Sequence, residues 1–321
     1  MPTCTETVAV VGGGIIGTSW ALVFARAGCK VRVFDQSLEV RAGVRARVAT
    51  ADAASLAATP HRKTADAADL VTTAETLAGA VTGATWIQEC IPERLELKRA
   101  LFSALDGLAL PGAVLASSTS SLPMSSIADG LAGRARCIVA HPGTPPHMLP
   151  VVEVVPAPWT DSALTERTIR VMVEVGQAPV LLAREVPGFV MNRLQGALLG
   201  EMFRLIGDGV VTPEGADTII RDGFGLRWPF VGPLAGIDLN APGGIKDYLA
   251  RYGFMFDDLA RERGSPDAVV TPDVVARLDA DLRARLPLAG QVDRRLGRDR
   301  RMAALLALRQ AFDADDGGLA K

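Results

Sequence analysis

The sequence predicts an α/β fold, a doubly wound and mostly parallel sheet, followed by a second domain that is entirely helical. Two observations support this prediction. In the first part of the chain, short apolar and β-branched runs alternate with helical stretches, as in sheets that helices cover on both faces. Beyond residue 186 the strand-like runs cease and the apolar residues recur at helical spacing. The chain has 321 residues, enough for two domains, which we place at 1–186 and 187–321.

Composition and charge exclude several classes of function. The formal net charge is −2 and the pI is near 6.0, whereas binding to nucleic acid or anionic membranes depends on clustered Lys and Arg. We therefore expect no nucleic-acid and no membrane partner, and we interpret the arginine-rich stretch 294–301 as a solvated or interface face of a helix. The four cysteines have no metal-ligand spacing, so the sequence predicts no metal site and a reducing, cytoplasmic environment.

The N-terminal unit has the order strand, glycine turn, helix, strand and acid. Residues 7–11 (TVAVV) form an apolar run that leads into the turn 12–17 (GGGIIG), which satisfies GxGxxG. The following helical stretch is closed by Gly28. A strand over 30–34 then ends in Asp35, eighteen residues after the last glycine of the motif. This combination is typical of the Rossmann-type, dinucleotide-binding fold.

Each of these positions has a physical task. Gly12 permits the tight turn, Gly14 lets the backbone approach a pyrophosphate, and Gly17 lets the helix pack closely on the strand. The N-terminus of the helix offers free N–H groups and a positive dipole to the phosphates. Asp35 can accept hydrogen bonds from the adenosine ribose and repels the additional phosphate of NADP. The sequence therefore predicts NAD as the cofactor.

The alternation of strands and helices continues through the first domain. We expect a helix that starts at Pro92 and carries Glu93 and Lys98, and a helical excursion within 41–69. Further strands are expected at 70–73, 85–91, 113–117, 137–141, 150–156 and 180–183.

A histidine and a glutamate lie where apolar strands are expected. His141 opens a Gly- and Pro-rich loop, and Glu153 follows twelve residues later inside PVVEVVP. A carboxylate in such a strand is costly to bury unless it is paired. A loop of this length can fold back and bring Glu153 to the imidazole, and a histidine held by a carboxylate suits a general base. The alternative interpretation is a structural histidine at the end of a strand.

A polar run, 117–123 (SSTSSLP), follows another expected strand at the carboxyl edge of the sheet, where doubly wound folds bind their ligands. By itself it fits a turn and a helix cap equally well.

Together, these motifs resemble the L-3-hydroxyacyl-CoA dehydrogenase superfamily, and within it the branch of lambda-crystallin and L-gulonate 3-dehydrogenase. The resemblance covers almost the whole chain. It rests on VVGGGIIGTSWA, IQECIPERLELK, SSTSSLP, AHPGTPP, VVEVVP and VPGFVMNRL. It implies an NAD-dependent dehydrogenase that forms a homodimer through its helical domain.

The resemblance also implies roles for individual residues. His141 matches the general base and Glu153 the carboxylate that orients it. Ser120 matches a serine that hydrogen-bonds the reacting oxygen, and Asn192 an asparagine that contacts substrate. The positions that contact NAD in such enzymes correspond here to the motif glycines Gly12, Gly14 and Gly17 and to Ile15, Ile16, Asp35, Glu93 and Lys98.

The loop after His141 departs from the family pattern. Thr144 stands where the family usually has asparagine, and His147 where the lambda-crystallin branch tends to have an aromatic residue. Thr144 keeps a hydroxyl but loses the amide, so we expect altered contacts to substrate or cofactor in this loop.

The function we expect is oxidation of the 3-hydroxyl of a small 3-hydroxy acid. The alternatives are a 3-hydroxyacyl-CoA substrate, such as 3-hydroxybutyryl-CoA, and an NAD-binding crystallin-like protein without physiological turnover. The β-hydroxyacid dehydrogenases are disfavoured, because they use a catalytic lysine where this chain has Asn192 and Arg193. Arg227 offers a bidentate fork for a substrate carboxylate, and an ordinary surface arginine is the alternative interpretation.

Overall fold

The computed structural model describes residues 4–56, 67–262, 271–285, 287 and 289–316. The chain divides into two compact units, Met1–Leu194 and Gln195–Lys321. The division lies inside helix α7 (Met191–Gly207), whereas the boundary expected at 186/187 lies in the segment just before that helix. The two units are described separately.

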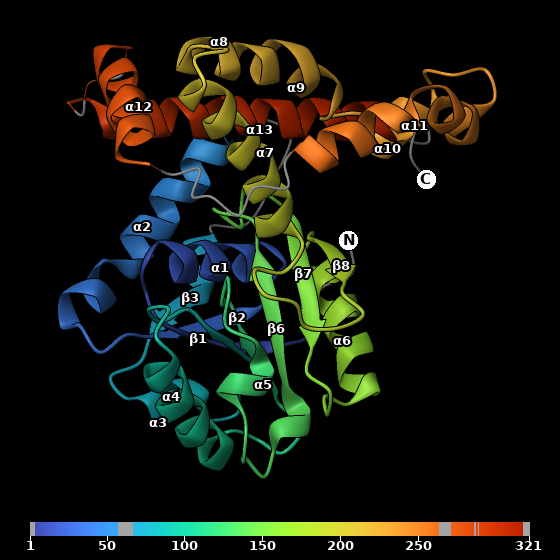
Figure 1. The fold of residues 1–321 in the computed structure, drawn as a ribbon. Helices are drawn as coiled ribbons and strands as arrows, with labels where there is room; N and C mark the ends of the chain where they lie inside the picture. The colour runs from blue at the N-terminus through green and yellow to red at the C-terminus, as the bar shows by residue number, and fades with distance from the viewer. Residues whose placement is uncertain (1–3, 57–66, 263–270, 286, 288, 317–321) are drawn as a thin grey trace. The chain divides into compact units, whose positions relative to one another are not determined.

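The first unit contains an eight-stranded sheet with the strand order β3-β2-β1-β4-β5-β6-β7-β8 (Figure 1). Neighbouring strands pair in parallel, except β6 and β7, which are antiparallel. This confirms the predicted α/β fold. The strands are β1 (Thr7–Val11), β2 (Lys30–Phe34), β3 (Val71–Thr73), β4 (Trp86–Glu89), β5 (Val114–Ser117), β6 (Cys137–Pro142), β7 (Val151–Pro156) and β8 (Ala178–Leu181).

Helices cover both faces of this sheet because successive residues of a strand point to opposite sides. Val8 and Val10 of β1 are buried in one apolar cluster, which includes Trp20 of α1. Ala9 and Val11 are buried in a second cluster, which includes Phe102 of α4. The helices of this unit are α1 (Ile15–Arg26), α2 (Leu38–Leu56), α3 (Leu77–Val81), α4 (Leu95–Leu108), α5 (Met124–Ile127) and α6 (Ser162–Glu174), with 3-10 turns at Ala67–Leu70 and Arg134–Arg136.

The strand register brings three loops to the carboxyl edge of the sheet. Val11 at the end of β1 is level with Glu89 at the end of β4, and Glu89 is level with Ser117 at the end of β5. In the antiparallel pair of β6 and β7, His141 is the direct partner of Glu153. The glycine turn, the segment after Glu89 and the serine loop therefore start from one line across the sheet.

Some predicted element boundaries are wrong, for local reasons. The helix expected from Pro92 begins at Leu95, because Arg94 is extended (φ −130°, ψ 120°), so Glu93 lies before the helix. Beyond the domain boundary, helix α7 begins only at Met191, because Gly188 and Phe189 have left-handed φ values of 74° and 49°. The last strand is Ala178–Leu181 rather than 180–183. Of the helical excursion expected within 41–69, residues 57–66 lie outside the described part of the chain.

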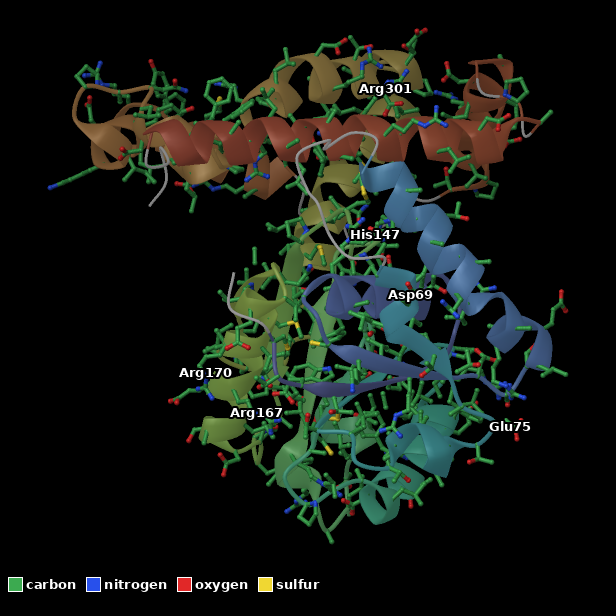
Figure 2. The ribbon with its side chains drawn as sticks, turned by 180° about the vertical axis from the view of Figure 1, so that it is seen from behind. Asp69, Glu75, His147, Arg167, Arg170 and Arg301 are labelled. Atoms are coloured by element: carbon green, nitrogen blue, oxygen red, sulfur yellow. The ribbon has the colours of Figure 1, made fainter. Side chains whose placement is uncertain are left out.

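All secondary-structure elements in the described part of the second unit are helices, which confirms the predicted class of the second domain. After α7 it contains α8 (Pro213–Thr218), a π-helical turn (Ile219–Phe224), α9 (Gly225–Arg227), α10 (Pro233–Asp238), α11 (Gly244–Glu262), α12 (Pro272–Arg285) and α13 (Gln291–Asp316). The arginine-rich stretch 294–301 lies in α13, and its last residue, Arg301, is labelled in Figure 2. Few apolar side chains in the described part of the second unit are buried, among them Ile206, Val274 and Ala303.

Candidate active site

The glycine turn between β1 and α1 has the geometry that a dinucleotide requires. Gly12 has a φ of 103°, and a Cβ there would lie 2.5 Å from the carbonyl oxygen of Cys90. A Cβ on Gly17 would lie 1.8 Å from the carbonyl oxygen of Gly12, so helix and turn are in direct contact. A Cβ on Gly14 would meet nothing within 4 Å, and Gly14 lines a cavity of about 570 Å³. The open side of the turn therefore faces this cavity.

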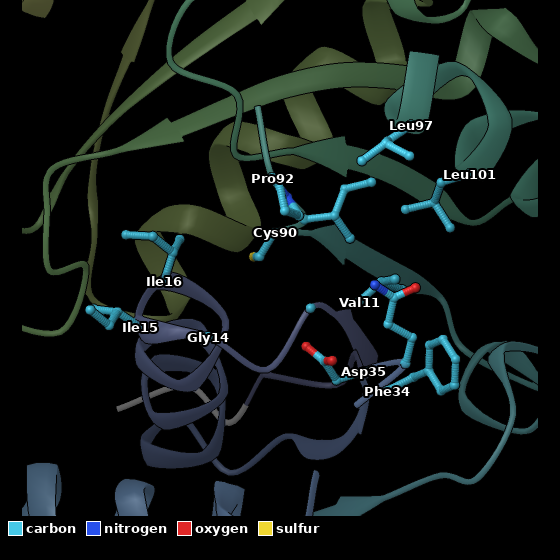
Figure 3. A pocket seen from close by; sticks show the side chains of 13 residues that line it. Val11, Gly14, Ile15, Ile16, Phe34, Asp35, Cys90, Pro92, Leu97 and Leu101 are labelled. Carbon is cyan, nitrogen blue, oxygen red and sulfur yellow. The ribbon is translucent and has the colours of Figure 1, made fainter. Parts of the chain in front are cut away.

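The first turn of α1 presents backbone N–H groups at the mouth of the same cavity. Its N-cap is Gly14, which supplies no side-chain cap, and the first turn carries no acidic residue. N–H groups at a helix start have no partner within the helix, and the dipole favours an anion there. Ile15 and Ile16 line the cavity beside them (Figure 3).

Asp35 lies at the end of β2 on the border of the cavity (Figure 3). Its carboxylate accepts hydrogen bonds from the backbone N–H of Gly13 (2.8 Å) and of Ser37 (2.9 Å). Arg41 donates to the Asp35 carbonyl oxygen at 2.6 Å. A carboxylate has about four acceptor positions, so two remain for ribose hydroxyls.

Apart from Gln36, most of the remaining cavity lining is apolar and suits a nucleobase. Its lining includes Phe34, Ile91, Pro92, Leu97 and Leu101 (Figure 3). The glycine turn, the ribose acceptor and the apolar wall together fit the adenosine and pyrophosphate parts of NAD.

His141 and Glu153 form a buried pair on the antiparallel strands β6 and β7. His141 Nδ1 lies 2.7 Å from Glu153 Oε2, and the two residues are 5% and 2% exposed. The ring of Phe189 lies against the imidazole, with 5.6 Å between ring centroids. With Nδ1 held by the carboxylate, Nε2 is the nitrogen left to exchange a proton with a ligand.

The second oxygen of Glu153 caps the start of α7. Glu153 Oε1 accepts hydrogen bonds from the backbone N–H of Val190 and of Met191, both at 2.8 Å. The next residue, Asn192, donates from Nδ2 to the carbonyl oxygen of Ser120 at 2.7 Å. Hydrogen bonds thus link His141 to Glu153 and Glu153 to the backbone of Val190 and Met191. Asn192 follows Met191 in the chain and is hydrogen-bonded in turn to Ser120.

The serine loop after β5 is held by Glu93. Glu93 Oε1 accepts hydrogen bonds from the hydroxyl of Thr119 (2.6 Å) and from the backbone N–H groups of Ser120 (2.9 Å) and Ser121 (3.0 Å). Partial burial opposes the charge on Glu93, but the Thr119 hydroxyl and the Lys98 ammonium outweigh it and lower its pKa to about 2 from 4.5. The stabilisation is therefore present above the ordinary pKa and is lost as the pH falls through about 2.

Lys98 lies beneath this loop and not at the surface of the cavity. Its side chain is 1% exposed, and Nζ contacts Glu89 Oε1 at 2.7 Å, Glu89 Oε2 at 2.9 Å and Glu93 Oε2 at 3.3 Å. Glu89 is fully buried and also accepts hydrogen bonds from the Ser117 hydroxyl and the Ile91 N–H.

The two departures from the family pattern lie in the loop between β6 and β7. Thr144 is exposed and precedes a cis peptide bond to Pro145. His147 (labelled in Figure 2) shares a hydrogen bond with the hydroxyl of Ser19 in α1. The exposed Arg227 belongs to the second unit, where its guanidinium lies 5.8 Å from the ring centroid of Phe224.

Among the described residues, no three His, Cys, Asp or Glu side chains are grouped as metal ligands would be. In the same part of the chain, no helix combines the length and the apolar character that crossing a membrane requires.

Two family models match the chain over adjoining ranges. The model described as "3-hydroxyacyl-CoA dehydrogenase, NAD binding domain" matches residues 7–186, and the one described as "3-hydroxyacyl-CoA dehydrogenase, C-terminal domain" matches residues 188–265. The chain belongs to the 3-hydroxyacyl-CoA dehydrogenase family. It is therefore an NAD-dependent oxidoreductase that acts on a CH–OH group. The predictions of this family and of NAD as cofactor are confirmed.

The similar proteins include members of the lambda-crystallin branch. The chain is 45% identical over 251 residues to the lambda-crystallin homolog of Bos taurus, which is 77% of each chain. It is 36% identical over 255 residues to L-carnitine dehydrogenase of Streptomyces griseus, with 78% of this chain and 75% of that protein covered. The solved structure of 5-formyl-3-hydroxy-2-methylpyridine 4-carboxylic acid 5-dehydrogenase superposes with a TM-score of 0.82 at 25% identity, covering 95% and 98% of the two chains.

The sequence did not predict a role for Glu89 or the hydrogen bonds that surround it. Glu89 lies in the run WIQEC at the end of a short apolar strand. The available signal is the one that drew attention to Glu153, because a carboxylate in a buried strand needs a partner.

Substitution of Asp35 by asparagine should relax the preference of the enzyme for NAD over NADP. The change removes a negative charge next to the ribose and leaves the Arg41 guanidinium nearby. We expect the ratio of the NADPH to the NADH dissociation constant to fall by at least about tenfold, which corresponds to about 1.4 kcal/mol. Fluorescence titration with both nucleotides measures this ratio. The control is Glu39→Gln, which removes one negative charge at an exposed position of α2 and should leave the ratio unchanged.

Proposed function

We propose that the enzyme oxidises the 3-hydroxyl of a small free 3-hydroxy acid, of the L-gulonate type, to the 3-keto acid. The observation that carries this proposal is the buried pair of His141 and Glu153, with 2.7 Å between Nδ1 and Oε2. Bound NAD supplies the hydride acceptor for the carbinol carbon. The residues of this chain bind and orient the substrate and handle the hydroxyl proton.

In the proposed mechanism, His141 Nε2 removes the proton of the substrate hydroxyl. Glu153 holds Nδ1, which fixes the tautomer in which Nε2 accepts a proton, and stabilises the imidazolium that results. The hydroxyl of Ser120 donates a hydrogen bond to the reacting oxygen. Asn192 Nδ2 is engaged by the Ser120 carbonyl, so we assign to Asn192 the positioning of Ser120 together with contact to the substrate.

The similarity to relatives supports a free acid. The lambda-crystallin homolog of Bos taurus and the L-carnitine dehydrogenase of Streptomyces griseus each match more than three quarters of the chain, and carnitine is a small 3-hydroxy acid. A 3-hydroxyacyl-CoA ester, such as 3-hydroxybutyryl-CoA, is the second candidate, and the family description favours it.

NADH formation with a matched substrate panel separates the two candidates. The panel holds L-gulonate, 3-hydroxybutyrate, carnitine and 3-hydroxybutyryl-CoA at equal concentration. Turnover confined to free acids supports the proposal, whereas a strong preference for the CoA ester contradicts it. NADH binding without turnover on any member would instead favour a crystallin-like protein that binds the cofactor only.

We further propose that the enzyme is a cytoplasmic homodimer. The second unit leaves large apolar side chains exposed, among them Leu226 (69%), Leu234 (71%), Leu239 (70%) and Phe254 (66%). Exposure of this extent is typical of a surface that a partner covers. Sedimentation equilibrium should give twice the chain mass of 33.7 kDa, and a monomer at micromolar concentration would contradict it.

The cysteines in the described residues are free thiols, as a reducing compartment such as the cytoplasm would keep them.

A further inference from the structure

A continuous network of charged groups lies beneath the serine loop of the proposed active site. It starts at Glu89 at the end of β4, passes through Lys98 in α4 and reaches Glu93 in the segment between them. Lys98 is thus shared by two carboxylates, one fully buried and the other 35% exposed at its side chain. We propose that Glu89 and Lys98 are positioning residues that place Ser120 by fixing Glu93. This inference rests on the role of Ser120 in the proposed function.

The cost of burying these groups shows that the network is not an incidental surface contact. A lysine that is 1% exposed loses nearly all of its hydration, and the attraction of a carboxylate repays that loss only when the geometry is good. Lys98 has that geometry, because Nζ contacts both oxygens of Glu89, at 2.7 and 2.9 Å. Burial raises the pKa of Glu89, and the Lys98 ammonium opposes that rise.

The network touches the loop at two places. At its buried end, Glu89 Oε2 accepts from the Ser117 hydroxyl, which in turn accepts from the backbone N–H of Thr119 at 3.1 Å. At its outer end, Glu93 Oε1 accepts from the backbone N–H groups of Ser120 and Ser121 at 2.9 and 3.0 Å. Successive N–H groups of the loop are therefore tied to one ion network.

The Ser120 peptide is held from both sides. Its N–H donates to Glu93 Oε1, and its carbonyl oxygen accepts from Asn192 Nδ2 at 2.7 Å. The Ser120 hydroxyl lies 3.4 Å from Glu93 Oε1, the longest of these contacts, and is the most readily released to a ligand. The arrangement fixes the backbone of Ser120 while leaving its hydroxyl available.

Two variants test whether Lys98 acts on the loop. The double substitution Glu89→Gln/Lys98→Met removes both charges from the buried site, so that no unpaired charge remains there, and takes the ammonium away from Glu93. Glu93→Gln breaks the outer end of the network at a more exposed position and covers the case in which the double variant does not fold. The control is Arg26→Met/Asp52→Asn, which removes another largely buried ion pair between α1 and α2.

Amide hydrogen exchange in the protein without cofactor gives the first readout. In the double variant and in Glu93→Gln, exchange of the Ser120 and Ser121 amides should become at least about tenfold faster, because their acceptor is displaced or weakened. In the control, exchange in this loop should match the unchanged protein. Unchanged exchange at both amides in both test variants would overturn the proposal, whether or not the substrate assignment is right.

Kinetics and cofactor binding give the second readout. At saturating NAD, so that a contact of Glu93 or Lys98 to the cofactor does not enter the rate, we expect kcat to fall by about 10- to 100-fold, because a misplacement of about 1 Å has effects of that size. A weaker NADH complex with unchanged kcat would assign Lys98 to the cofactor and overturn the inference. If the unchanged enzyme turns over no member of the substrate panel, the proposed function fails, and the exchange experiment still decides the positioning role.

Discussion

Replacement of His141 by alanine should reduce kcat by about 10³- to 10⁴-fold and leave the dissociation constant of NADH nearly unchanged. General-base catalysis contributes about 10²- to 10⁴-fold in enzymes, and His141 is the imidazole whose Nδ1 is held by a buried carboxylate. The glycine turn and Asp35 that form the cofactor site contact one another, at 2.8 Å between Gly13 N and Asp35 Oδ2. None of the hydrogen bonds described for that site involves His141.

A matched control lies six residues further on, in the loop between β6 and β7. His147→Ala also removes an imidazole, but one that binds the Ser19 hydroxyl in α1 rather than a carboxylate. We expect its kcat to fall by far less than that of His141→Ala. The measurements are initial rates on the best member of the substrate panel and fluorescence titration with NADH. Loss of NADH binding together with turnover in His141→Ala would show that His141 is structural.

Most of the cofactor site could be predicted from the sequence because it is local. The glycines, the helix start and Asp35 lie within one strand–helix–strand unit, whose geometry follows from the chain itself. The ends predicted for the first two strands agree with β1 (Thr7–Val11) and β2 (Lys30–Phe34). Even the closest packing in the turn, where a Cβ added to Gly17 would lie 1.8 Å from the Gly12 carbonyl oxygen, involves residues only five positions apart.

The proximity of His141 and Glu153 could also be anticipated, because a short loop joins two apolar strands and a buried carboxylate needs a partner. The antiparallel register places the two residues directly opposite one another. The sequence contained no comparable signal that Glu153 also binds the backbone of Val190 and Met191, which lie 37 and 38 residues further on. That contact depends on how the chain returns to the sheet after β8.

The network of Glu89, Lys98 and Glu93 could not be predicted for a related reason. We expected Glu93 in a helix, where its side chain would point along the helix face, but the helix begins only at Leu95. In the extended segment before it, the carboxylate reaches the loop after β5, 26 to 28 residues away in sequence. Helix propensity alone does not set that boundary, because the hydrogen bonds between Glu93 and the serine loop favour the non-helical conformation of this segment.

Substitution of Glu153 by glutamine should impair both catalysis and stability, because the two oxygens of the carboxylate serve different partners. Oε2 pairs with His141 Nδ1, and Oε1 accepts from the N–H groups of Val190 and Met191. A carboxylate accepts on both oxygens, whereas a glutamine amide accepts on one side and donates on the other. One of the two contacts must therefore be lost.

Each orientation of the amide has its own consequence. If the amide oxygen caps α7, the NH2 group faces His141 Nδ1 and turns it into an acceptor, so that the proton moves to Nε2 and the base is lost. If the oxygen faces His141, the NH2 group opposes the N–H groups of Val190 and Met191, which leaves buried donors unpaired at a cost of about 1–3 kcal/mol. In both cases the negative charge that stabilises an imidazolium is absent.

We therefore expect Glu153→Gln to lower kcat by about 10²- to 10⁴-fold and the free energy of unfolding by about 1–3 kcal/mol. Steady-state rates and urea denaturation measure the two effects. Glu185→Gln is the control, because Glu185 also accepts a backbone N–H, that of Ser125 at 2.8 Å, but has no histidine partner among the described residues. A variant that loses stability and keeps kcat would show that Glu153 only caps α7. A variant that loses kcat by the expected factor would connect the helix start and the proposed base through a single side chain.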